Sequence, residues 1–269
     1  MSAANTSDRA YLEAQAASCV VGGATLLQSA SVRFQSGQFA AILGPNGAGK
    51  STLLSLLCGQ RHPSQGRILL QGQALASYPL QALARRRALL PQDLSVAFDY
   101  AVQEVVELGR YPHRQQPSTV ESDIVQRAMQ ATGVSALAQR VLNSLSGGER
   151  ARAQLARVLA QIWEPVPEGH SRWLLLDEPT AALDVHHQHA VLRLVRSWAH
   201  HHGVGVVAVL HDLNLALRYA DQALLLQNGR IQADGPPLRV LDPATVRRIW
   251  QVEAHPVHDA DGCPQLLMA

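Results

Sequence analysis

The sequence has 269 residues, of which 47% are hydrophobic and 16% charged, a balance that excludes an intrinsically disordered protein and provides for a sizeable core. With 23 basic and 21 acidic residues, and a net charge of +2 when the histidines are neutral, the composition gives no sign of a nucleic-acid partner. Only 4% of the residues are aromatic, so the core must be mostly aliphatic, as is typical of helices packed on buried parallel strands.

Residues 1–16 are polar and predict a loose leader without the apolar segment of a signal peptide. No apolar run approaches the roughly 20 residues that a membrane-spanning helix needs. Cys19, Cys58 and Cys263 have neither disulfide nor metal-site spacing, which favours a reducing compartment. The sequence therefore predicts a cytosolic protein, and any role at a membrane would require a partner chain.

Short apolar runs alternate with helical stretches along most of the chain. A strand pattern starts near Val20, and the run Gln38–Leu43 predicts a buried strand. Further strands are expected at Trp173–Leu176, Val204–Leu210 and Ala223–Leu226. This alternation predicts an α/β fold in which helices cover both faces of a mainly parallel sheet.

The middle of the chain has helical patterns without a convincing strand. The expected helices are Val102–Leu108, Val120–Ala131 and Gly148–Gln161. We therefore expect a helical subdomain, at about 93–165, inserted into one domain that spans 17–250. One or two helices are expected over 236–250, and 251–269 form a C-terminal tail.

A glycine-rich loop follows the strand that ends at Leu43. The sequence GPNGAGKST at 44–52 fits G-x-x-x-x-G-K-[S/T] between a strand and a helix, which is the context this phosphate-binding motif requires. Its glycines let several backbone N–H groups point at one anion. Lys50 is expected to reach the β- and γ-phosphates, Ser51 to ligate Mg²⁺ and Thr52 to support the α-phosphate. The residues expected to hold the nucleotide are Gly44, Pro45, Asn46, Gly47, Ala48, Gly49, Lys50, Ser51 and Thr52.

An apolar strand with the sequence WLLLDE, at 173–178, ends in two acids. Because a buried carboxylate without a partner is costly, acids at the tip of a core strand usually face a metal or a cation. Asp177 is expected to hold Mg²⁺ directly or through water, and Glu178 to act as general base for the attacking water. A phosphate loop with such acids still occurs in many nucleotide-binding families.

The sequence LSGGE, at 145–149, opens the last helix of the insert. Ser146, Gly147 and Gly148 offer a hydroxyl and free backbone N–H groups to an anion, and Glu149 suits the positive end of the helix dipole. A capped helix without further function would use the same residues. Five specified residues make such a coincidence improbable.

Taken together, these motifs resemble the ABC ATPase family over about residues 18–235. Their order along the chain is GPNGAGKST, Pro91-Gln92, LSGGER, LLLDEPTAALD and LHDLNLA. The resemblance implies a P-loop NTPase (RecA-like) fold with an antiparallel N-terminal β part and an inserted helical signature subdomain. It also implies a homodimer, in which the signature residues Ser146, Gly147 and Gly148 of one copy close over ATP bound by the other.

The same resemblance implies roles for residues outside the phosphate loop. Gln92 would contact Mg²⁺ and the attacking water, and Ala181–Asp184 would form a loop across the dimer interface, with Asp184 beside the nucleotide. His211 would hydrogen-bond the γ-phosphate and help to position Glu178. The expected catalytic residues are Glu178, His211, Gln92 and Lys50, and the expected metal ligands are Ser51, Gln92 and Asp177, with ATP and Mg²⁺ as cofactors.

One position departs from the family. Members usually have an aromatic residue ahead of the phosphate loop that stacks on the adenine, but Val21 occupies this place in VVGGATLL at 20–27. Since stacking on an aromatic ring contributes about 1–3 kcal/mol per base, we expect loose discrimination between ATP and GTP. A strong ATP preference would point to Tyr11 or another ring instead.

Within the family, three stretches resemble the bacterial haemin import ATPases, in the branch that serves iron-siderophore, cobalamin and haem uptake. They are ELGRYPHR at 107–114, ARAQLARVLAQIW at 151–163 and DEPTAALDVHHQHA at 177–190. This resemblance implies an importer at the cytoplasmic face of the bacterial inner membrane, with two membrane-spanning permease subunits and a periplasmic substrate-binding protein. Import of ferric siderophores or of cobalamin is the alternative, and export with separate membrane chains remains open.

Two other classes of function compete with transport. A soluble ABC ATPase of DNA repair or translation would usually have tandem cassettes, a long coiled-coil insert or basic arms, which the sequence lacks. A regulatory subunit that binds nucleotide without hydrolysing it would not need both Glu178 and His211. A protein of either class would not energise transport.

Two further groups of residues, a set of histidines and a set of aromatics, are candidates for a function. The histidines at 186, 187, 189, 200, 201 and 202 lie on a predicted helix, where a solvated face is a better explanation than direct haem binding. Phe98, Tyr100 and Tyr111 lie in the stretch from Gln92 to Tyr111, and such side chains are favoured at interfaces. They are expected either to dock a cytoplasmic helix of the permease or to fill the core of the helical subdomain.

Overall fold

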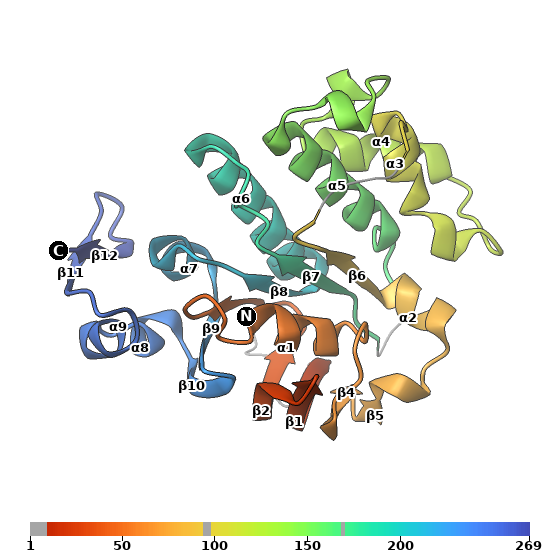
Figure 1. Ribbon diagram of the computed structural model, residues 1–269. Coiled ribbons are helices and arrows are strands. Elements are labelled where there is room, and N and C mark those ends of the chain that lie inside the picture. Colours follow the sequence, from red (N-terminus) through yellow and green to blue (C-terminus); the bar gives the residue numbers. More distant parts are fainter. Residues whose placement is uncertain (1–9, 94–97, 168–169) are drawn as a thin grey trace, which may run out of the picture.

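The computed structural model describes residues 10–93, 98–167 and 170–269, and its centre is a six-stranded sheet (Figure 1). Five neighbouring strands run parallel, and the edge strand β10 is antiparallel to β9. The spatial order is β10 (Arg230–Gly235), β9 (Gln222–Gln227), β3 (Phe39–Leu43), β8 (Gly205–Val209), β7 (Trp173–Asp177) and β6 (Arg87–Leu90). The predicted α/β class with a mainly parallel sheet is confirmed.

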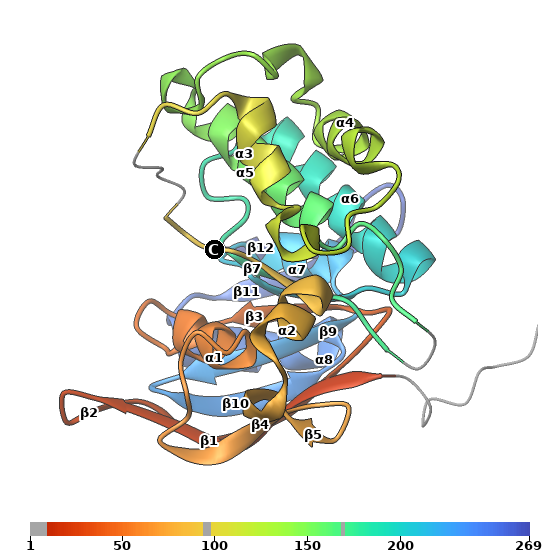
Figure 2. The same ribbon diagram turned by 90° about the vertical axis from the view of Figure 1, so that its right-hand side faces the viewer.

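Different elements cover the two faces of this sheet, as Figures 1 and 2 show. Every residue of β3 is buried, and alternate side chains enter two separate cores. Ala40 and Ile42 pack on the side of α1 (Lys50–Leu57), whereas Phe39 and Ala41 pack on the side of three other helices. Those helices are α5 (Gly147–Gln161), α6 (Val185–His202) and α7 (Leu213–Tyr219). Strands covered on both faces are continuously apolar, which is why the sequence located them.

Beyond α1 lies a second sheet of four antiparallel strands, in the order β2, β1, β4 and β5. Its strands are β1 (Tyr11–Val21), β2 (Ala24–Gln35), β4 (Gln65–Leu70) and β5 (Gln73–Ala74). The short elements η2 (Leu75–Ser77) and α2 (Leu80–Arg86) then lead into β6. The antiparallel N-terminal part was therefore predicted correctly.

The expected loose leader is wrong for residues 11–16, because β1 begins at Tyr11 and not near Val20. Leu12 and Ala14 are each 1% exposed, and both pair with β2 on one side and β4 on the other. The segment has few β-branched or aromatic residues, so its own propensity did not indicate a strand. Pairing on both sides supplies the stability that local preference lacks. Residues 1–9 lie outside the described residues.

The residues between β6 and β7 form a helical layer with a core of its own, at the top of Figure 1. Its elements are α3 (Val102–Leu108), η3 (Tyr111–His113), α4 (Glu121–Ala131), η4 (Ser135–Leu137), η5 (Leu142–Ser144) and α5. The three predicted helices are thus found with bounds that differ by at most one residue at either end. Residues 94–97 of the insert lie outside the described residues.

The C-terminal residues are folded. After α8 (Pro237–Val240) and α9 (Pro243–Trp250), the expected tail forms a hairpin of β11 (Ala254–His258) and β12 (Pro264–Met268). Leu266 is 6% exposed and belongs to the same core as α7 and α9. In the parts of the chain described above, no helix is both long and apolar enough to cross a membrane.

The contact between two central strands makes a specific stability prediction. A Cβ atom at Gly205 would lie 2.4 Å from two ring atoms of Trp173, whose side chain is 1% exposed and donates from Nε1 to Ser171 Oγ at 2.8 Å. Gly205→Ala should therefore lower the free energy of unfolding by about 1–3 kcal/mol in urea denaturation. In a Trp173→Phe background the smaller ring leaves space, and the cost should shrink; an equal cost in both backgrounds would refute this packing explanation.

Candidate active site

The phosphate loop joins β3 to α1, and its shape depends on glycine. Gly44 and Gly49 have φ values of 143° and 98°, which side chains rarely tolerate. A Cβ atom at Gly44 would also lie 2.0 Å from the carbonyl oxygen of Leu226, and one at Gly49 would lie 2.7 Å from that of Leu26. The backbone of β9 and β2 therefore presses against the loop from outside, so that no other residue fits at these two positions.

A cavity of about 510 Å³ lies over this loop. It is lined by Leu26, Asn46, Gly47, Ala48, Gly49, Lys50, Ser51, Thr52, Gln92, Glu178 and His211. Four separate stretches of sequence that carry predicted site residues thus meet at one place. Leu26, on β2, was not predicted.

Lys50 is 6% exposed and folds back over its own loop. Its Nζ donates to the carbonyl oxygens of Gly44, at 2.9 Å, and Pro45, at 3.0 Å. Burial lowers the pKa of Lys50, while the nearby carboxylates of Glu178 and Asp177 act in the opposite direction. Two backbone carbonyls therefore hold the ammonium group at the cavity. A charged phosphate oxygen, as a stronger acceptor, can replace them.

Two side chains with oxygen atoms that could bind a metal lie together at the end of β7. Ser51 Oγ, in the first turn of α1, donates to Asp177 Oδ1 at 3.1 Å. Burial raises the pKa of Asp177, and the hydrogen bond from Ser51 opposes this effect. A hydroxyl and a carboxylate at this separation match the oxygen ligands that Mg²⁺ prefers, so the two residues fit the predicted metal site.

Glu178 lies between two other predicted residues. Its Oε1 is 2.6 Å from Nε2 of His211, and its Oε2 accepts from Nε2 of Gln92 at 3.1 Å. The backbone of Glu178 has a φ of 52°, which is unusual for a residue other than glycine. Such strain persists only where the surroundings enforce it, and it is frequent at active sites.

The signature residues lie outside this cavity. Ser146 caps α5, where its Oγ accepts from the N–H of Glu149 at 3.3 Å while the Glu149 carboxylate accepts from Ser146 N at 2.9 Å. Ser146 and Gly147 are exposed, and Gly148 packs against the backbone of Ala182. Of the described residues, those that line the phosphate-loop cavity do not include these three.

Asp184 also lies outside the cavity, at the start of α6. Its carboxylate accepts from the N–H of His187 at 2.9 Å and lies 2.9 Å from Nδ1 of the same residue. This cap fixes the end of the segment 181–184 that precedes the helix. Within one chain, Asp184 is a capping residue, and its predicted place beside a nucleotide stays a prediction that needs a second copy.

Val21 is 45% exposed at the end of β1 and does not line the cavity described above. Tyr11 lies at the other end of that strand, where its ring packs 4.2 Å from the guanidinium carbon of Arg33. Loose discrimination between ATP and GTP stays a prediction.

The predicted docking aromatics lie on the surface. Phe98 is 69% exposed, Tyr100 39% and Tyr111 58%. The rings of Phe98 and Tyr100 meet edge to face, 6.2 Å apart. These exposures rule out the alternative that the three rings fill the core of the helical subdomain.

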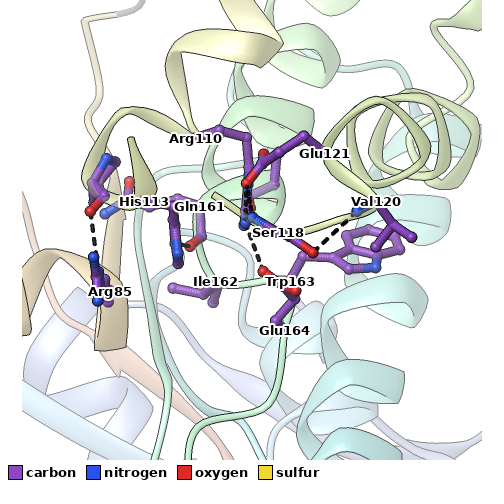
Figure 3. Close-up of polar contacts among 12 residues, drawn as sticks. Arg85, Arg110, His113, Ser118, Val120, Glu121, Gln161, Ile162, Trp163 and Glu164 are labelled. Atoms are coloured by element: carbon purple, nitrogen blue, oxygen red, sulfur yellow. Dashed lines mark hydrogen bonds and ion pairs between the residues drawn. The ribbon is translucent and has the colours of Figure 1, made fainter. Parts of the chain in front are cut away.

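A buried guanidinium holds the turn that carries Tyr111, as Figure 3 shows. Arg110 is 7% exposed and donates to the carboxylate of Glu121 at 2.7 and 3.0 Å, to Glu164 at 2.6 Å and to the carbonyl of Ala160 at 2.8 Å. Its hydrogen bond holds the pKa of Glu121 below the ordinary value. The turn after α3 is thereby fixed to the start of α4 and to the end of α5.

The same turn also contacts α2, the helix that leads into β6. Arg85, at the end of α2, donates from Nε to the carbonyl of Pro112 at 3.1 Å. Gln161, at the end of α5, donates to the carbonyls of Ala84 at 2.7 Å and Arg87 at 3.0 Å. The exposed ring of Tyr111 therefore lies where the helical subdomain meets the large sheet.

The histidines of α6 have contacts of their own. His189 Nδ1 lies 2.7 Å from the hydroxyl of Tyr219, and His200 Nε2 lies 2.8 Å from Asp221 Oδ2. In the described residues, no group of three or more His, Cys, Asp or Glu side chains could hold a metal ion. The expectation that the chain does not bind haem directly stays a prediction.

Comparison with known proteins agrees with this geometry. Residues 27–181 match the family described as ABC transporter. The chain belongs to the ABC transporter family. It is similar to the hemin import ATP-binding protein HmuV of Methylobacillus flagellatus, with 45% identity over 250 residues that cover 93% of this chain and 92% of that protein. HmuV of Pseudomonas entomophila is 47% identical over 232 residues, 86% of this chain and 89% of that protein.

Solved structures extend the similarity to the fold. A metal-chelate type ABC transporter in an inward-facing conformation matches with a TM-score of 0.79 at 26% identity, over 97% of this chain and 98% of that one. A dimeric ATP-binding cassette bound to ADP and phosphate matches with a TM-score of 0.72 at 22% identity, over 84% and 98%. The predicted P-loop NTPase fold is confirmed. As a member of this family, the chain binds ATP and couples its hydrolysis to transport.

The buried carboxylate of Asp177 makes a prediction that separates stability from activity. Because burial raises its pKa, the ionised side chain destabilises the nucleotide-free protein at neutral pH, and the neutral Asp177→Asn variant should melt at a higher temperature. The same variant should lose at least about 100-fold in Mg²⁺-dependent ATPase rate, because the predicted metal ligand is lost. Thermal denaturation and phosphate release measure the two effects. A lower melting temperature, or an unchanged rate, would contradict this reading of Asp177.

Proposed function

We propose that this chain energises the import of haemin across the inner membrane of a bacterium, as the ATP-hydrolysing subunit of an ABC importer. Support comes from two relatives, 45% and 47% identical to it, which are named hemin import ATP-binding proteins and align with most of the chain. A cassette need not touch its cargo, so ferric siderophores or cobalamin are the alternative substrates. Ligand binding by the purified transporter complex would separate the three.

The observation that carries the mechanism is the position of Glu178 between Gln92 and His211, at a cavity that Lys50 and Ser51 also line. Lys50 would bind the β- and γ-phosphates in exchange for its two loop carbonyls. Backbone N–H groups of the glycine loop and the start of α1 would hold the remaining phosphate oxygens.

Ser51, Asp177 and Gln92 would hold Mg²⁺, which supplies positive charge to the phosphates when bound. Glu178 would accept a proton from the attacking water, because its carboxylate is already held from both sides. His211 and Gln92 would orient that carboxylate, and His211 would also donate to the γ-phosphate. Lys50 would stabilise the charge that develops in the transition state.

A second copy of the chain would complete the site. Ser146, Gly147 and Gly148 lie at a helix N-terminus, which suits a phosphate group, but they do not line the chain's own cavity. In a homodimer these residues would close over the ATP held by the partner's Lys50, and Asp184 would lie at the same interface. Binding of ATP by both chains at once would then drive dimer closure.

Replacement of the proposed base tests this mechanism. Glu178→Gln should lower ATP hydrolysis by at least about 100-fold while ATP binding persists, so that an ATP-bound dimer accumulates in size-exclusion chromatography. Glu107→Gln, at an exposed position in α3, is the matched control and should behave as wild type. Full activity of Glu178→Gln would refute its role as base. An inactive wild type, even with its partner, would favour a regulatory nucleotide-binding subunit.

The membrane partner would dock on the exposed aromatics Phe98, Tyr100 and Tyr111. Arg110 supports this idea, because its buried contacts fix the turn that carries Tyr111. The partners would be two membrane-spanning permease subunits, which hold the cassettes at the cytoplasmic face, and a periplasmic substrate-binding protein that delivers the cargo. No nucleic-acid partner is proposed.

A charge in the docking surface should weaken this contact. Tyr111→Asp is expected to reduce co-purification of the permease at least about tenfold, since aromatic anchors often contribute 2 kcal/mol or more. Basal ATPase of the isolated cassette should stay unchanged, because Tyr111 does not line the cavity. Val257→Asp, at a 41% exposed position on β11, is the control. Normal co-purification and coupling of Tyr111→Asp would refute the docking site.

A further inference from the structure

The C-terminal hairpin is fastened to the helix that follows His211. Asn214, in the first turn of α7, accepts from the N–H of Leu266 at 2.7 Å and donates to the carbonyl of the same residue at 3.1 Å. One turn later, Arg218 Nη1 lies 2.7 Å from Asp259 Oδ2. Residues four apart share one face of a helix, so both contacts fix the same side of α7 to the hairpin.

The hairpin is itself well held. The carboxylate of Asp259 accepts from the N–H of Cys263 at 2.8 Å and from that of Asp261 at 3.0 Å, which closes the turn between β11 and β12. Leu266, whose backbone is hydrogen-bonded to Asn214, is 6% exposed and packs in the main core. Figure 1 shows the hairpin beside α7, at the end of the chain. The hairpin is therefore a firm anchor for α7.

His211 depends on α7 for its position. Asp212 follows it directly and caps the helix, where Oδ1 accepts from the N–H groups of Asn214 at 2.7 Å and Leu215 at 3.1 Å. The side chain of His211 is 46% exposed, and beside it lies a second cavity, of about 410 Å³, between residues 211–214, Trp250 and Met268. On this side the imidazole has open space in place of packed neighbours. Apart from its contact with Glu178, the imidazole is therefore positioned through the cap and the first turn of α7.

We infer that Asn214 is a positioning residue for ATP hydrolysis, through which the C-terminal hairpin holds the turn that carries His211. The inference rests on the proposed role of His211. Asn214 touches neither the cavity that would hold ATP nor Glu178, so it acts on the rate through His211 alone. The hairpin, expected from the sequence to be only a tail, thereby becomes part of the catalytic machinery.

The test compares steady-state kinetics of the full-length chain. Asn214→Ala should lower kcat for ATP hydrolysis by about 3- to 10-fold, since small displacements of catalytic groups are costly, and leave KM within about 2-fold. ATP-dependent dimerisation in a Glu178→Gln background should be unchanged. Arg247→Met is the matched control: it removes the 3.1 Å contact with Glu253, which ties the base of the same hairpin to α9, and should leave kcat at the wild-type value.

A second pair of variants separates positioning from general weakening. In a His211→Ala background, Asn214→Ala should cause no further loss of the residual rate, because the residue that it positions is gone. A further loss of similar size would overturn the inference, as would a normal kcat of Asn214→Ala. If Asn214→Ala does not fold, Asn214→Asp keeps an acceptor for the N–H of Leu266 and provides the same comparison. Full activity of His211→Ala would instead refute the proposed role of His211, whatever the result at Asn214.

Discussion

The carboxylate of Glu178 joins residues that follow three neighbouring strands, and the rest of the site depends on this contact. Gln92 follows β6, Glu178 follows β7 and His211 follows β8. Parallel strands end at the same edge of a sheet, so the strand order alone brings the three side chains together. Since β3 lies next to β8, Lys50 enters at the same edge. The positive φ of Glu178 is a local strain of the kind that is frequent at active sites.

In the proposed homodimer, one chain provides only part of the groups that act on each ATP. The signature lies at the N-terminus of α5, and the carbonyl of Ala160, near the C-terminus of the same helix, accepts from Arg110. A single rigid helix thus connects the turn that carries Tyr111 with Ser146. A partner bound at that turn would therefore act on the signature, and through it on the ATP of the second chain. The C-terminal hairpin, through Asn214, would instead act on the chain's own site by holding the turn that carries His211.

The parts predicted from the sequence are those encoded by neighbouring residues. The phosphate loop is one stretch, and β7 is a continuous apolar run with Asp177 and Glu178 at its end. What the sequence could not indicate arises from contacts between distant segments. Leu26 enters the cavity only because β2 lies across the loop, and β1 is stabilised by pairing that its own residues do not favour. Asn214 and Leu266 are 52 positions apart, and no local pattern links them.

The surface position of Tyr111 was also undecided from sequence, because an aromatic ring fits an interface and a core equally well. The structure places Tyr111 on the surface, whereas its neighbour Arg110 points inward to two carboxylates. A buried guanidinium is costly unless it is fully paired, so Arg110 must point to these carboxylates. Composition alone gives no information on whether Tyr111 lies in the core or on the surface.

Complementation between two inactive chains would be the decisive measurement. Lys50→Met should abolish hydrolysis by removing phosphate binding, and Ser146→Arg should abolish it by blocking the signature. A mixture of the two variants forms heterodimers in which the intact Lys50 of one chain meets the intact Ser146 of the other. The mixture should therefore hydrolyse ATP although neither variant does so alone. If the mixture stays inactive while heterodimers form, the site is not shared between chains in the way proposed.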